Sequence, residues 1–466
     1  MERGKSYFFC GIGGSGMLPL ACIVRARGHE VAGSDRALDQ RRLGDKFDYL
    51  RSLGIELHPQ DGSGLTNARQ VLVTSAAIEE SVPDVVKAKE LGCARVSRPE
   101  LLAELFNATW LPIAVGGTSG KSTVTGMIGW ILHGTGRAPT VMNGAVMKNF
   151  VSSDAPFASA IVGDGDAFVS EVDESDGSIA LYRPQVAVLG NITLDHKSLE
   201  ELRRLFRDFA LQSEKIVLNL DDDETRLLAA VLPPERVVTF SFEDPQADVF
   251  GSNLVPAPFG IEFDVVDRRD GEAAAVRLQL PGRHNAANAL AAIAAAIYAG
   301  VDLATAALFL SEFKGLRRRF ELVGSANGVT VIDDFAHNPD KIAATLSTLH
   351  AFPGRLLVFF QPHGFAPLRV MRRELIDGFV RNLGEEDVLI LSDPAYYGGT
   401  TDKKVGSGEI VEGVRAAGRI AEHIAQRQAC GERLVEMARP GDRIVIMGAR
   451  DDTLSLFAAE VVDKLR

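Results

Sequence analysis

The chain has 466 residues, which is too long for a single hydrophobic core and suits about three domains. Its net charge of −12 and charged fraction of 24% are typical of a globular protein and exclude a nucleic-acid interface built on clustered Lys and Arg. The N-terminus lacks the features of a signal peptide, and no stretch approaches the roughly 20 apolar residues of a membrane span. We therefore expect a cytoplasmic protein, a monomer or homodimer, with no nucleic-acid or membrane partner.

Apolar runs of strand length alternate with segments of helical spacing along the chain, which is typical of an α/β protein with parallel sheets. Expected strands include 7–10, 71–74, 112–115, 167–172, 186–189 and 216–218, followed by a second set at 329–333, 356–360, 388–392 and 443–447. Three domains fit this order: a Rossmann-like N-terminal domain (1–107), a central P-loop ATPase domain with a parallel sheet (108–315) and a C-terminal Rossmann-like domain (316–466).

The first expected strand is followed by a glycine cluster that opens a helix, as in dinucleotide-binding turns. An acidic residue ends the next strand, near the place of a ribose-binding acid. Such a turn binds a pyrophosphate whatever is attached to it, so a nicotinamide dinucleotide, a sugar-nucleotide diphosphate and a structural turn all stay open. The residues concerned are Gly11, Gly13, Gly14, Gly16 and Asp35.

A second glycine-rich turn lies at 114–127, where AVGGTSGKSTVTGM follows an apolar run. Its flexible backbone amides can surround phosphates, Lys121 can neutralise them, and the Ser122 hydroxyl can bind Mg2+. The pattern is a shortened G-T-x-G-K-S form, because Val115 stands where the strict motif has its first glycine. The sequence predicts an ATP site here, with a glycine turn that binds no ligand as the alternative.

Two polar runs close apolar strands of the central domain. Residues 171–178, EVDESDGS, gather carboxylates where an open α/β sheet places its ligands, and such oxygens suit Mg2+. Residues 191–196, NITLDH, end with a histidine beside another carboxylate. The pattern favours a metal or substrate site at these strand ends. The alternatives are a solvated acidic loop for the first run and a structural histidine for the second.

The stretch 242–280 alternates apolar and polar residues and predicts a small antiparallel insertion in the central domain. The alanine-rich stretch 286–299 predicts a buried helix. Asn285 and Asn288 lie at its start, and their amides can pair with an adenine edge as well as cap a helix. Capping explains one of these amides but hardly both.

Together these stretches resemble the Mur ligase family, which uses ATP to add amino acids to the peptidoglycan precursor. The resemblance spans nearly the whole chain in the family's order. The matching stretches are GIGGSGM (11–17), GSD (33–35), GTSGKST (117–123), EVDESDGS (171–178), NITLDH (191–196), GRHNAANALAA (282–292), LRRRF (316–320), DDFAHNP (333–339) and QPH (361–363).

The resemblance implies a role for each matching residue. A UDP moiety, rather than NAD, would be held by Gly11, Gly13, Gly14, Gly16, Ser34 and Asp35. ATP would be bound by Gly117, Thr118, Ser119, Gly120, Lys121, Ser122, Thr123, Asn288, Arg319 and Asp333. Catalytic groups would be Lys121, Glu171, His196 and Arg319, with Mg2+ on Ser122, Glu171 and His196. The side where the amino acid enters would be lined by His337, Asn338 and His363.

Within the family, the glycine cluster and the acidic run are most like the ligases that join L-alanine to UDP-N-acetylmuramate. The resemblance implies an acyl-phosphate intermediate, formed from ATP and attacked by the incoming amine. Asn338 and the stretch 364–369 depart from the alanine-ligase pattern, so the identity of the amine stays open. Alternatives are a murein tripeptide-recycling ligase, a Mur ligase paralogue with a different acceptor, a nicotinamide oxidoreductase and a non-catalytic nucleotide-binding protein.

Overall fold

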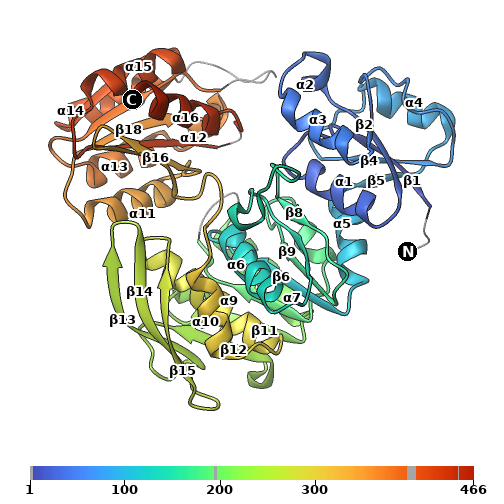
Figure 1. The fold of residues 1–466 in the computed structure, drawn as a ribbon, viewed down its shortest axis with the longest axis horizontal. Helices are drawn as coiled ribbons and strands as arrows, with labels where there is room; N and C mark the ends of the chain where they lie inside the picture. The colour runs from blue at the N-terminus through green and yellow to red at the C-terminus, as the bar shows by residue number, and fades with distance from the viewer. Residues whose placement is uncertain (1–3, 194–196, 396–405, 450) are drawn as a thin grey trace. The chain divides into compact units, whose positions relative to one another are not determined.

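The computed structural model describes residues 4–193, 197–395, 406–449 and 451–466 (Figure 1). The chain forms two compact units, Met1–Gln279 with Arg283–Gly315, and Leu280–Gly282 with Leu316–Arg466. The first unit holds a five-stranded and a ten-stranded sheet, and the second a six-stranded sheet. The predicted α/β class is confirmed. Among the described residues, no helix has the length and apolar character that crossing a membrane requires.

The first sheet is entirely parallel, in the order β3-β2-β1-β4-β5. The order reverses at β1, so the carboxyl ends of β1 and β4 mark the crevice where open α/β sheets bind ligands. The strands are β1 (Ser6–Cys10), β2 (Glu30–Ser34), β3 (Glu56–His58), β4 (Gln70–Thr74) and β5 (Arg95–Ser97). The helices are α1 (Met17–Ala26), α2 (Arg36–Asp39), α3 (Gly44–Ser52), α4 (Pro83–Leu91) and α5 (Arg98–Asn107).

The second sheet has β6 (Leu111–Gly116) near its centre, parallel to both neighbours, β9 and β10. All residues of β6 are buried, as expected for a strand covered by helices on both faces. The other strands are β7 (Thr140–Met142), β8 (Ala160–Ile161), β9 (Ala167–Glu171), β10 (Val186–Leu189), β11 (Lys215–Asn219), β12 (Val237–Ser241), β13 (Val249–Ala257), β14 (Gly260–Asp267) and β15 (Ala273–Leu278).

Strands β13 to β15 pair antiparallel at one edge, which confirms the predicted insertion. Helix α9 (Arg283–Tyr298) is mostly buried, as the alanine-rich stretch predicted, and it packs against α6 (Lys121–Gly134). The remaining helices of this unit are α7 (Leu199–Leu211), α8 (Asp223–Ala229) and α10 (Leu303–Ser311), with short 3-10 turns η1 (Lys148–Phe150), η2 (Ser178–Leu181) and η3 (Pro234–Arg236).

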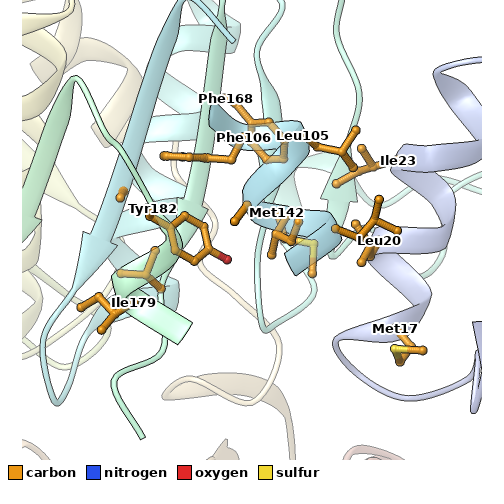
Figure 2. Close-up of a cluster of buried hydrophobic side chains, with 14 of the residues drawn as sticks. Met17, Leu20, Ile23, Leu105, Phe106, Met142, Phe168, Ile179 and Tyr182 are labelled. Carbon is orange, nitrogen blue, oxygen red and sulfur yellow. The ribbon is translucent and has the colours of Figure 1, made fainter. Parts of the chain in front are cut away.

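The two sheets of the first unit share one apolar cluster (Figure 2). The Phe106 ring of α5 lies 5.6 Å from Phe168 of β9 and 5.2 Å from Tyr182, measured between centroids. Each large side chain buried there contributes about 1.5–3 kcal/mol. The first glycine turn and the phosphate loop therefore belong to a single packed body. Side chains of the cluster include Leu20, Ile23, Leu105, Phe106, Met142, Phe168, Ile179 and Tyr182.

The second unit has the strand order β16-β17-β21-β18-β19-β20, and among its described residues only the β16–β17 pair is antiparallel. Its strands are β16 (Glu321–Ala326), β17 (Val329–Asp334), β18 (Leu356–Gln361), β19 (Val388–Leu391), β20 (Ile420–His423) and β21 (Arg443–Gly448). Its helices are α11 (Pro339–His350), α12 (Phe365–Val370), α13 (Arg372–Asn382), α14 (Ser407–Ala416), α15 (Arg427–Met437) and α16 (Leu454–Lys464).

Candidate active site

The phosphate loop joins β6 to α6, and glycines set its backbone. Gly117 and Gly120 have φ angles of +112° and +84°, which residues with a side chain rarely adopt. A Cβ on Gly120 would lie 2.5 Å from Asn288 Oδ1, so the predicted ATP-binding amide of α9 lies directly against the turn. The loop leads into the N-terminus of α6, where the helix dipole favours an anion.

Side chains at the start of α6 pair with the acidic loop (residues 171–178) that follows β9. Lys121 Nζ donates to Glu174 Oε2 at 2.9 Å and to the carbonyl oxygen of Gly117 at 2.8 Å. Ser122 Oγ donates to Glu171 Oε2 at 2.8 Å. The structure thus brings together the predicted lysine, hydroxyl and carboxylate. It adds Glu174, whose side chain is only 6% exposed and which sequence reasoning did not single out.

The Glu171 carboxylate lies against the backbone of Gly144. A Cβ at Gly144 would stand 2.1 Å from Glu171 Oε1, which no side chain can do without displacing the carboxylate. Asn143, the preceding residue, donates from Nδ2 to the carbonyl oxygen of Ser122 at 2.9 Å. The segment after β7 therefore holds both members of the Ser122–Glu171 pair.

Asn191 braces the phosphate loop from the end of β10. Its Oδ1 accepts from the backbone N–H of Ser119 at 2.9 Å, and its Nδ2 donates to the carbonyl oxygen of the same residue at 3.0 Å. Thr118 Oγ1 also accepts from the backbone N–H of Thr193 at 2.9 Å. The sequence points to the histidine of the NITLDH run, whereas the described contacts are made by Asn191 and Thr193. The predicted metal ligand His196 lies outside the described residues.

The first glycine turn is closed by Asp35. Its Oδ2 accepts from the backbone N–H of Gly13 at 2.8 Å, and its Oδ1 accepts from the N–H of Ala37 at 2.8 Å and caps α2. Lys46 Nζ donates to the carbonyl oxygen of Gly13 at 3.1 Å. Asp35 therefore shapes the turn as well as standing at the predicted ribose position.

Ser34, predicted to contact the UDP moiety, is fully buried beneath this turn. Its Oγ donates to Asp84 Oδ2 at 2.5 Å, and Asp84 Oδ1 accepts from the backbone N–H of Gly62 at 2.9 Å. Burial raises the pKa of the Asp84 carboxyl. The structure thus places the Ser34 side chain in a buried polar network, away from the surface of the turn.

In the second unit, Asp333 near the end of β17 is fully buried, and burial raises the pKa of its carboxyl to about 7. Arg318 Nε lies 3.3 Å from Asp333 Oδ2, and its other nitrogens donate to backbone carbonyls at and after the end of β21, 2.7 and 2.9 Å away. The family resemblance implies that its neighbour Arg319 contacts ATP. Both guanidinium groups lie over the Phe335 ring, 4.2 Å from its centroid for Arg319 and 5.3 Å for Arg318. The ion pair with Asp333 is made by Arg318.

The predicted amino-acid side brings two histidines together. The rings of His337 and His363 are 5.2 Å apart and nearly perpendicular. His337 Nδ1 lies 2.8 Å from the carbonyl oxygen of Phe335, and burial, with the charge of Lys341, lowers the pKa of His337 to about 3. The Asn338 side chain caps α11, accepting from the backbone N–H of Lys341 at 3.0 Å. The Asn338 side chain thus has a structural contact of its own.

Three family models match the chain in succession. Residues 6–110 match the description "Mur ligase family, catalytic domain", residues 115–296 "Mur ligase middle domain" and residues 318–450 "Mur ligase, glutamate ligase domain". The chain is 37% identical over 421 residues to a UDP-N-acetylmuramate–L-alanine ligase of Streptomyces coelicolor, covering 88% of this chain and 87% of that protein. It is 34% identical to the ligase of the same name from Caldicellulosiruptor saccharolyticus, covering 91% of each.

Solved structures show the same fold. A UDP-N-acetylmuramate–alanine ligase from Thermotoga maritima superposes with a TM-score of 0.79 at 23% identity, covering 98% of both chains. A murein peptide ligase from Psychrobacter arcticus gives a TM-score of 0.71 at 25% identity, covering 100% of this chain and 99% of that one. The chain belongs to the Mur ligase family, whose members are ATP-dependent ligases that form amide bonds.

Proposed function

We propose that this chain joins L-alanine to the carboxylate of UDP-N-acetylmuramate in peptidoglycan precursor synthesis, converting ATP to ADP and phosphate. The observation that carries the proposal is the acidic loop, whose Glu171 and Glu174 contact Ser122 and Lys121 of the phosphate loop. The curated relatives named for this reaction support it. Because ATP and UDP-linked sugars are cytoplasmic metabolites, we propose that the reaction takes place in the cytoplasm.

The reaction has two displacement steps. A carboxylate oxygen of the sugar acid attacks the γ-phosphorus of ATP, the bond to the β,γ-bridging oxygen breaks, and ADP leaves. The uncharged amine of the amino acid then attacks the carbonyl carbon of the acyl phosphate, the carbon–oxygen bond to phosphate breaks, and the amine gives up its extra proton. The first step brings anions together, so Lys121 acts by attracting the γ-phosphate oxygens while charge spreads over them.

The Ser122–Glu171 pair fits Mg2+. A hydroxyl and a carboxylate oxygen 2.8 Å apart at the start of a phosphate-binding helix are hard donors of the kind that Mg2+ prefers. Bound there, Mg2+ would neutralise charge on the transferred phosphate. His196 as a further ligand stays a prediction, as do Asn288, Arg319 and Asp333 as ATP contacts.

A tripeptide-recycling ligase, or a paralogue with another acceptor, is the second candidate. Asn338 and the stretch 364–369 depart from the alanine-ligase pattern, and both belong to the unit that we expect to receive the amine. The likeness to a murein peptide ligase points the same way.

The test measures ATP-dependent phosphate release with UDP-N-acetylmuramate against a panel of L-amino acids and the murein tripeptide. Release with L-alanine supports the proposal, and release only with the tripeptide or another amine supports the second candidate. Absence of ADP formation with every acid and amine pair, in the presence of Mg2+, would overturn both.

A further inference from the structure

Arg98 lies across the first glycine turn. It is the first residue of α5, directly after β5, and Ser97 caps the helix through the backbone N–H of Glu100. A Cβ on Gly16 would stand 3.1 Å from Arg98 Cδ and 3.2 Å from Arg98 Nη1. The guanidinium group and its stem therefore cover the residue that immediately precedes α1.

The glycine turn itself, GIGGSG, carries no basic residue, and the chain has a net charge of −12. A helix N-terminus supplies only about half a positive charge, whereas a diphosphate is a multiply charged anion. Lys46 is at the turn but is buried, and its amine donates to the carbonyl oxygen of Gly13. Arg98 is 24% exposed and presents a planar fork of donors, the geometry that suits phosphate oxygens.

Arg98 also reaches the acidic loop. Its Nη2 lies 3.9 Å from Asp176 Oδ2, while Asp176 Oδ1 accepts from the backbone N–H of Ser178 at 2.8 Å. The distance is long for an ion pair, and a partly exposed pair of this kind stabilises little. Asp176 thus orients the guanidinium loosely and leaves it able to take a stronger anionic partner.

The acidic loop therefore has one end at each phosphate site. Glu171 and Glu174 contact Ser122 and Lys121, and Asp176, further along the loop, contacts Arg98. We propose that Arg98 binds the diphosphate of the nucleotide sugar and, through Asp176, positions that substrate relative to the phosphate loop. The inference rests on the proposed function and adds a residue to its substrate site.

The test compares Arg98→Gln with the control variant Arg95→Gln, which loses the same charge. Arg95 lies at the opposite end of β5, where it forms an ion pair with Glu80 at 2.6 Å. UDP is the probe, titrated calorimetrically into each full-length variant, with ATP titrated separately. We expect Arg98→Gln to bind UDP about tenfold more weakly, the effect of losing a charge-assisted contact. Its affinity for ATP should change less than about twofold. Arg95→Gln should bind UDP like the unmodified chain.

Steady-state kinetics with UDP-N-acetylmuramate separate positioning from folding. Arg98→Gln should raise KM for the nucleotide sugar while KM for ATP stays constant. Arg98→Lys keeps the charge but not the planar fork of donors, so its KM for the nucleotide sugar should lie between those of the unmodified chain and Arg98→Gln. Arg98→Met keeps the apolar stem over Gly16 and replaces the Gln variant if that one unfolds. A folded Arg98→Gln or Arg98→Met chain that binds UDP normally overturns the inference alone. An unmodified chain that binds neither UDP nor the nucleotide sugar overturns the proposed function instead.

Discussion

Lys121 and Glu174 form a hydrogen-bonded ion pair of 2.9 Å, beside the 2.8 Å contact between Ser122 and Glu171. One acidic loop therefore holds both side chains that we expect to meet ATP and its metal ion. The two pairs differ in what a nucleotide would do to them. Ser122 and Glu171 can share a metal ion without separating, whereas a γ-phosphate competes with Glu174 for Lys121.

Replacing Lys121 by Ala should lower kcat by at least about 100-fold, because the charge that attracts the γ-phosphate is lost. It should also lower the free energy of unfolding by about 1–3 kcal/mol, since Glu174 is left buried without its cation. The double variant Lys121→Ala/Glu174→Gln should recover the stability but not the activity. ADP formation and chemical denaturation measure the two effects. Near-normal ATP turnover in Lys121→Ala would contradict the role given to the loop.

Gly144→Ala should weaken the metal site by displacing the predicted ligand Glu171, without replacing any metal ligand. The new Cβ would stand 2.1 Å from Glu171 Oε1, so the carboxylate must move away from Ser122. We expect the Mg2+ concentration for half-maximal activity to rise about tenfold, the effect of losing one hydrogen-bonded contact of about 1.4 kcal/mol. Gly190→Ala is the matched control, since a Cβ there meets nothing within 4 Å. Equal Mg2+ requirements in the two variants would show that Gly144 does not fix Glu171.

Asn191→Asp should disturb the phosphate loop while changing few atoms. The aspartate can still accept from the backbone N–H of Ser119, but its second oxygen faces the Ser119 carbonyl oxygen that Asn191 Nδ2 now contacts. Two acceptors facing each other repel, so we expect KM for ATP to rise about tenfold. The affinity for UDP should stay unchanged, which excludes general unfolding. An unchanged KM for ATP would mean that the loop keeps its shape without Asn191.

The parts of the site that sequence could predict are those encoded locally. The phosphate loop follows from a short run of glycines behind a buried strand, and Lys121 and Ser122 have fixed places in it. Which carboxylate of EVDESDGS meets Lys121 depends on how the acidic loop turns, including Gly177 with its φ of +79°. The carboxylates of this run are chemically alike, so the sequence does not show that Glu174 is the one that contacts Lys121.

Contacts between distant segments escaped prediction for a different reason. Asp84 meets Ser34 from 50 residues further along the chain, and no local pattern reports that pairing. Arg98 is the first residue of α5, and the local sequence predicts only the N-terminal cap of that helix. The position of Arg98 over Gly16 depends on where β5 lies in the sheet. Within the run LRRRF, three consecutive arginines are alike in sequence, and only the fold shows that Arg318 is buried, in a turn where its φ is +58°.

Acid should destabilise the second unit through His337. Burial lowers its pKa from 6.5 to about 3, so the folded state keeps the ring neutral where the unfolded chain binds a proton. The contribution of His337 to the free energy of unfolding is fully present above pH 6.5. It is lost as the pH falls toward 3, by about 1.4 kcal/mol per pH unit.

At pH 5 the loss from this one residue amounts to about 2 kcal/mol. His337→Gln, which cannot titrate, should therefore lose less stability than the unmodified chain between pH 7 and pH 5, even if it is less stable at pH 7. Thermal unfolding followed at a series of pH values measures the difference. Parallel curves for the two proteins would show that the ring is protonated equally in the folded and unfolded states, and thus that His337 is not held neutral against His363 and Phe335.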